Sequence, residues 1–180
     1  LLVEKAIDYL DILIDNSLIS KIASNSSFWD SIRKSYHTSV QYMSSETTLE
    51  IASKALRVLT LLEIQAKENE KTINEITEFY KQYSPEQLIP CLTIPEIMTI
   101  SALQFLFDLT VFLTFSPPII SQTEELKAAL HNLKIEFMEN PESIKDRIRQ
   151  GGLRNRPNFL SIENMKIVDA LIEKFQKLFK

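Results

Sequence analysis

One helical pattern recurs three times along this chain at nearly constant spacing. Residues 101–115 form its most apolar stretch, in which Ser101 is followed by Ala-Leu-Gln-Phe-Leu and, three positions later, by Leu109. Similar arrangements begin at Ala6 and Ala55, so the copies at Ala6, Ala55 and Ala102 are separated by 49 and 47 positions. Apolar side chains at three- and four-residue steps are typical of one face of an α-helix. Three such helices at regular intervals constrain the architecture more than any other feature.

Glycine is almost absent from the sequence. Gly151 and Gly152 are the only two among 180 residues. Tight hairpin turns usually need glycine, so this scarcity argues against an all-β fold. A hydrophobic content of 44% in a chain of this length is enough for one substantial core. We therefore expect a single all-α domain spanning residues 1–180, with eight to ten helices and no strand.

Helix periodicity and end signals place these elements. Thr123 and Ser161 stand where they can cap the helices that follow them. Gly151-Gly152 is expected to stop the helix that begins near residue 140, with residues 154–157 as a polar connector. The helices are expected at about 2–15, 18–23, 28–43, 48–67, 72–83, a short one opened by Pro85, one ending near Phe115, and 124–138, 140–150 and 161–179.

The repeated pattern reads Ala-(Leu/Ile)-x-apolar-Leu-x-x-Leu, and a single unit cannot bury both faces of its inner helix. With these residues the chain resembles the armadillo/HEAT class of helical repeat proteins over roughly residues 1–150. The glycine that usually bends an armadillo unit between its first two helices is absent, which favours an irregular or HEAT-like version. The matching residues are Ala6, Ile7, Leu10 and Leu13; Ala55, Leu56, Leu59 and Leu62; and Ala102, Leu103, Leu106 and Leu109.

The resemblance implies stacked repeats that form a scaffold or adaptor for another protein, within a multi-subunit assembly. A compact non-repeat bundle and a superhelical adaptor domain of the VHS/ENTH type are the alternatives. In stacked repeats the inner helices line a concave groove. Gln104, Asp108 and Phe115 share one helical stripe and are therefore candidates for partner binding, although Asp108 also fits a plain solvated surface acid. Trp29 is a further candidate anchor, or packs half-buried between helices.

A basic segment supplies a second hypothesis. Five cations lie within twelve residues against one acid, Asp146, and arginine binds phosphate or carboxylate through paired hydrogen bonds. The alternative function is therefore an adaptor for lipid headgroups or nucleic acid. The simpler interpretation is a solvated helix end whose arginines face the helix dipole. The cations are Lys145, Arg147, Arg149, Arg154 and Arg156.

Catalytic and cofactor signatures are missing from the sequence. His37 and His131 are 94 positions apart and in no metal-ligand spacing. Cys91 has no basic neighbour to activate its thiol, and phosphate-binding loops need glycines that this chain lacks. We therefore expect a non-enzymatic protein with no cofactor and no metal.

The compartment and the completeness of the chain can also be predicted. A lone cysteine excludes an internal disulfide, which favours an intracellular location, cytoplasmic or nuclear. Asp108 and Pro117-Pro118 interrupt the apolar run from Ile97 to Ile120, so we expect no transmembrane segment. The chain begins within a helical pattern, and we interpret it as a piece of a larger protein.

Overall fold

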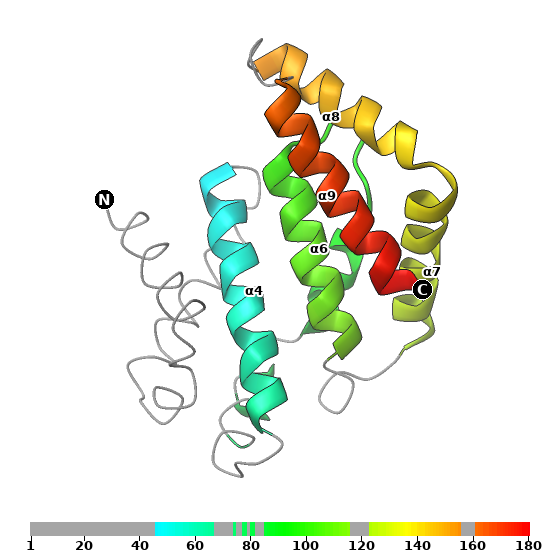
Figure 1. Cartoon of the computed structure of the whole chain (residues 1–180). Helices are drawn as coiled ribbons and strands as arrows, with labels where there is room; N and C mark the ends of the chain where they lie inside the picture. The colour runs from blue at the N-terminus through cyan, green and yellow to red at the C-terminus, as the bar shows by residue number, and fades with distance from the viewer. Residues whose placement is uncertain are drawn as a thin grey trace. The chain divides into compact units, whose positions relative to one another are not determined.

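The structure is a computed structural model, which describes residues 46–66, 74, 77–78, 80–81, 85–115, 123–155 and 161–180 (Figure 1). Most of these residues are helical and none is in a strand, which confirms the all-α prediction for this part of the chain. The helices predicted before residue 46, together with Trp29 and His37, lie outside the described residues. The elements are α4 (Glu46–Ala66), the 3-10 helix η1 (Pro85–Cys91), α6 (Ile100–Phe115), α7 (Glu124–Glu139), α8 (Pro141–Asn155) and α9 (Ile162–Phe179).

Contacts between Cα atoms divide the chain into two compact units. Unit 1 comprises Leu1–Gln87 and Val111–Ser121, and unit 2 comprises Leu88–Thr110 and Gln122–Lys180. The boundary between them falls inside α6, after Thr110. The expectation of a single domain over residues 1–180 stays a prediction.

In unit 1, α4 is buried on nearly every side at its centre. Three polar side chains share this environment with five apolar ones, and Thr60 Oγ1 donates a hydrogen bond to the Leu56 carbonyl oxygen at 2.9 Å. Tyr80 and Phe112 meet edge to face, with ring centroids 6.0 Å apart. The wide apolar sector of residues 48–67 therefore corresponds to a helix that is covered on more than one face. The buried residues are Ala52, Ser53, Lys54, Ala55, Leu56, Val58, Leu59 and Thr60.

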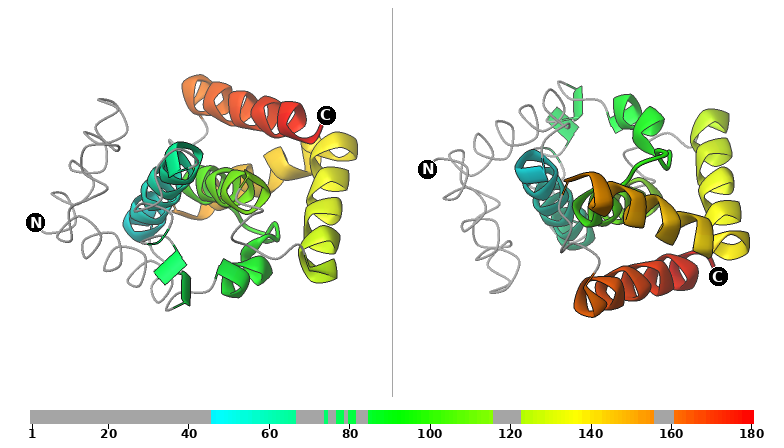
Figure 2. Two further views of the ribbon diagram at one scale, coloured as in Figure 1. Left: turned by 90° about the horizontal axis from the view of Figure 1, so that it is seen from below. Right: turned by 90° about the horizontal axis from the view of Figure 1, so that it is seen from above.

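Unit 2 has an aromatic core where three helices meet. The rings of Phe137 (α7) and Phe175 (α9) stack with centroids 3.8 Å apart, and Phe107 of α6 meets Phe175 edge to face at 5.1 Å. The Gln176 amide donates to the Phe137 carbonyl oxygen at 3.1 Å. Helices α7, α8 and α9 are arranged around residues 100–110 of α6 (Figure 2), and α7 packs against both α8 and α9.

Two helix starts confirm the capping predictions. Thr123 precedes α7, and its hydroxyl accepts a hydrogen bond from the Leu126 backbone N–H at 3.1 Å. Ser161 does the same for α9, with the Asn164 N–H at 3.2 Å. Both residues have the extended backbone of an N-cap.

The predicted end of the helix at Gly151-Gly152 is wrong. Helix α8 continues through both glycines to Asn155. Glycine inside a helix is less favourable than alanine but does not prevent the helix from continuing. Residues 154 and 155, which were expected in a polar connector, therefore belong to α8.

The described copies of the repeated pattern occupy different places in their helices. Ala55 lies near the middle of α4 and is buried, whereas Ala102 lies in the first turn of α6 and is half-buried. Ala6 lies outside the described residues. In the described part of the chain, the structure shows an all-α fold and no repeat architecture.

Candidate functional site

Asp108 was expected on a surface stripe of α6, and that expectation is wrong. Its side chain is only 4% exposed, among buried neighbours on several faces of the helix. The Gln104 amide, one turn earlier and half-buried, donates to Asp108 Oδ2 at 3.0 Å. The apolar pattern suggested cover on one face, but α6 is covered more widely. The predicted partner site at Gln104 and Asp108 is therefore not an open surface. Phe115 is the last residue of α6, and its side chain lies outside the described part of the structure. Trp29 lies outside the described residues altogether.

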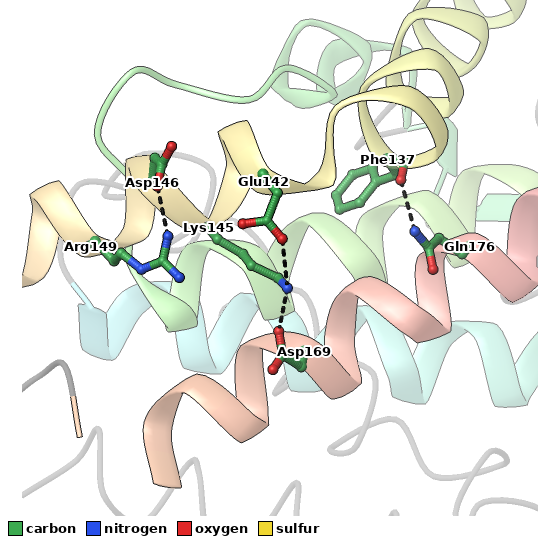
Figure 3. Close-up of polar contacts among 7 residues, drawn as sticks. All are labelled: Phe137, Glu142, Lys145, Asp146, Arg149, Asp169 and Gln176. Carbon is green, nitrogen blue, oxygen red and sulfur yellow. Dashed lines mark hydrogen bonds and ion pairs between the residues drawn. The ribbon is translucent and has the colours of Figure 1, made fainter. Parts of the chain in front are cut away.

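Lys145, in the basic segment, joins two helices of unit 2. Its ammonium lies 2.9 Å from Asp169 Oδ1 on α9 and 3.2 Å from Glu142 Oε1 on α8 (Figure 3). The hydrogen bond to Asp169 is the main cause that raises the pKa of Lys145, and Glu142 adds to it against the opposing effect of burial. Arg149 pairs with Asp146 at 2.7 Å. These two cations therefore already have carboxylate partners within the chain.

Arg147 faces a different part of unit 2. Its Nη1 donates to the Ile94 carbonyl oxygen at 3.1 Å, and its own carbonyl oxygen accepts from the Met98 N–H at 3.3 Å. Arg147 thus ties the segment between η1 and α6 to α8. Lys145 and Arg149 lie on the same side of α8, because they are four residues apart. Arg147, two residues from each, lies on a different side.

The three described cations of the basic segment do not form one patch, because Arg147 points to different partners from Lys145 and Arg149. The side chain of Arg154 and the whole of Arg156 lie outside the described residues. Binding of phosphate-rich ligands stays a prediction, and the contacts of the three described cations are ones that stabilise the fold.

A groove of about 460 Å³ lies within unit 2, and we call it the α7 groove. One wall is the end of η1 and the segment after it, which lies beside α7 in both views of Figure 2. Arg147 of α8 completes the lining. The first wall is formed by Ile89, Pro90, Leu92, Thr93 and Ile94, and the second by Glu125, Ala129, Asn132, Leu133 and Glu136.

The floor of the α7 groove is apolar. Ile89, Leu92 and Leu133 are each 3% exposed or less, so they belong to the core and show only a small part of their surface in the groove. A volume of this size falls in the range of natural ligand pockets, about 300–1,000 Å³. The groove can therefore take one or two apolar side chains of a bound segment.

The α7 wall carries polar groups in a single row. Glu125, Ala129, Asn132 and Glu136 follow one another at four-, three- and four-residue steps, which places them on one face of the helix. Within the described part of the chain, the side chains of Glu125, Asn132 and Glu136 take part in no hydrogen bond or ion pair. The groove thus offers two unpaired carboxylates and an amide beside its apolar floor.

Of the histidines and the cysteine considered in the sequence, His37 lies outside the described residues. His131 is exposed on α7, and Cys91 is half-buried in η1, where burial raises the pKa of its thiol. Among the described residues, no cluster of three His, Cys, Asp or Glu side chains is placed to hold a metal ion. No helix in the same part of the chain is both long and apolar enough to cross a bilayer.

Comparison with known proteins adds no relative. No protein-family model, curated protein or solved structure matches the chain. The described residues therefore define the protein only as all-α, and the α7 groove is the feature on which function can be argued.

Sequence reasoning missed the α7 groove. The row at residues 125, 129, 132 and 136 is visible in the sequence, next to the predicted core face of the same helix. A second signal is Glu136 itself, an acid in the last turn of a helix, where acids are unfavourable. The opposite wall has no helical period of its own and is placed only by tertiary contacts.

Proposed function

We propose that this chain is a protein-interaction module that holds a short peptide segment of another protein in the α7 groove. The observation that carries the proposal is an apolar floor at Ile89, Leu92 and Leu133 edged by side chains without partners in the described chain. Such a combination of burial and hydrogen-bonding capacity is typical of binding sites. The sequence predicted the docking site on α6. Because Asp108 of α6 is buried, we propose α7 as the docking site instead.

The proposed role is binding and not catalysis. Glu125 and Glu136 are eleven residues apart on one helix, which separates their backbones by about 16 Å along the axis. Two carboxylates that act on a single bond lie within about 5–10 Å of each other. The geometry therefore favours contacts at the two ends of a bound segment over a shared reaction centre.

The proposal includes the role that the sequence predicts, a scaffold within a multi-subunit assembly. Stacked repeats of the armadillo/HEAT kind remain part of it, supported by the recurrence of the pattern at Ala6, Ala55 and Ala102. In such an assembly the α7 groove would dock a partner's segment while other surfaces hold further subunits.

Two neighbouring alanines on α7 allow a matched test. Ala129 lines the groove, whereas Ala128 is exposed and does not. Peptides selected from a random twelve-residue display library on the intact chain should lose binding to Ala129→Trp, because the indole fills the groove. They should keep binding to Ala128→Trp. Affinity is measured by fluorescence anisotropy of the labelled peptides.

A second blocking variant guards against misfolding. Asn132→Trp also fills the groove from an exposed position, and circular dichroism confirms that each variant stays helical. Peptides that bind the wild type and both blocking variants equally would overturn the proposed function, as would a library that yields no binder.

A further inference from the structure

Glu136 stands in the α7 groove at a position that the stability of the helix does not explain. It lies in the last turn of α7, where the helix carries the negative end of its dipole and no basic residue is present. A carboxylate there is locally unfavourable. Glu125, at the other end of the groove, is in the first turn, where the same dipole favours an acid. One of the two groove acids therefore has a local structural reason and the other has none.

Among the described residues, neither α7 nor the lining of the groove provides a cation that pairs with Glu136. The residues one turn away on α7 are Asn132, Leu133, Glu139 and Asn140, none of which is a cation. Arg147 lines the same groove but directs its Nη1 to the Ile94 carbonyl oxygen, and no ion pair joins it to Glu136 in the described part of the chain. Half-buried beside an apolar floor, the Glu136 carboxylate is a charge that lacks its counterpart.

We infer that Glu136 is a specificity-determining residue, which pairs with a lysine or arginine of the docked segment next to the apolar side chain that enters the α7 groove. This inference rests on the proposed function. Sites that carry out a function often break a local stability rule. Glu139 breaks the same rule in the same turn, but only Glu136 lines the groove. The lining has two carboxylates and one guanidinium, so its net charge of −1 complements a basic segment. The occupant is thus a peptide with an apolar anchor flanked by a basic residue.

The experiment uses the intact chain and the peptides selected on it. These peptides should be enriched in lysine or arginine within a few positions of an apolar residue. Glu136→Gln should weaken their binding about two- to fivefold, the usual size of a partly exposed ion pair. The same substitution should leave the midpoint of urea unfolding unchanged or raise it, because an unfavourable charge is removed. A purely structural glutamate would lower that midpoint.

Glu139→Gln is the matched control. Glu139 lies in the same last turn of α7 but does not line the groove, so its substitution should affect unfolding in the same direction and leave binding unchanged. Charge reversal sharpens the result. Glu136→Lys should weaken the basic peptides further and shift a fresh selection toward acidic ones.

The outcomes separate this inference from the proposed function. Some selected peptides could lose binding to Ala129→Trp and yet carry no basic residue, or bind Glu136→Gln as tightly as the wild type. Either result would overturn the role of Glu136 but keep the α7 groove as a binding site. An equal loss of affinity with Glu139→Gln would also overturn it, by showing a general effect of surface charge. Binding that survives Ala129→Trp would overturn both.

Discussion

Lys145 shows how one side chain of the basic segment contributes to the fold. Its ammonium bridges Glu142 on its own helix and Asp169 on α9, and its side chain is 22% exposed against 55% for Asp169. Ion pairs of this kind gain little when both partners are well solvated and more as one of them is covered. The α8–α9 bridge should therefore contribute a small but measurable free energy.

A double-mutant cycle on Lys145→Met and Asp169→Asn should give a coupling energy of about 0.5–1 kcal/mol from urea unfolding. Lys127 and Glu124 form an exposed pair on α7 with side chains 56% and 92% exposed, and the same cycle on them should give a value near zero. Equal coupling in the two cycles would show that burial of Lys145 has no energetic consequence.

The coupling should also depend on pH in one direction. The folded state raises the pKa of Lys145 above its ordinary value of 10.5, so folding favours the protonated ammonium. The stability contribution is therefore fully present below pH 10.5 and is lost as the pH rises through the folded-state pKa. Repeating the double-mutant cycle at increasing pH, starting from pH 7, measures this loss. A coupling energy that already decreases at pH values well below 10 would contradict the assigned cause.

Single residues also show how far the sequence could predict the site. The cap at Thr123 was predictable because it depends only on the next three residues. The burial of Asp108 was not, since it depends on what covers α6 from distant parts of the chain. The role of Arg147 was hidden for the same reason: its partner, the Ile94 carbonyl oxygen, is 53 residues away.

Among the elements, α9 contributes an aromatic side chain to the core of unit 2. Phe175 is fully buried and contacts the rings of both Phe107 and Phe137. Phe175→Ala should lower the free energy of unfolding by about 3–5 kcal/mol, because it leaves a cavity and removes the ring contacts with Phe107, Phe137 and Phe179. The control is Ile167→Ala on the same helix. Ile167 is 48% exposed, so its loss should change stability by about 0.5 kcal/mol or less. Similar effects for the two variants would mean that α9 does not dock through its aromatic face.

The continuation of α8 through its glycines makes another prediction. Gly151 and Gly152 lie inside the helix, so each substitution by alanine should stabilise the protein by about 0.5–1 kcal/mol. Thermal or urea unfolding measures the change. A glycine that ended the helix in a left-handed conformation would give the opposite sign, because alanine is disfavoured there. Destabilisation by both substitutions would restore the stop that the sequence suggested.

Helices with strong periods were the predictable elements. The predicted ranges of α7 and α9 differ from the observed ones by one residue, because a clear apolar face and a capping residue both act locally. The wall of the α7 groove at Ile89–Ile94 contains two core residues but no regular period. Its position follows from contacts with α7 and α8, which no short stretch of sequence encodes.

At the scale of the whole molecule, occupancy of the α7 groove should appear as stability. A ligand that binds only the folded state stabilises it in proportion to the logarithm of its concentration. A selected peptide at 100 times its dissociation constant should raise the free energy of unfolding of unit 2 by about 2.7 kcal/mol. The same peptide should leave Ala129→Trp unchanged. Equal stabilisation of both proteins would place the peptide elsewhere on the molecule.

Arg147 holds the segment before α6 by two bonds, one through its side chain and one through its backbone. The wall that this segment forms is therefore held in position before a peptide binds. A guest that meets a rigid surface does not lose affinity to the entropy of ordering a loop. Among variants of such a preorganised groove, the dissociation rate of the bound peptide should change far more than its association rate.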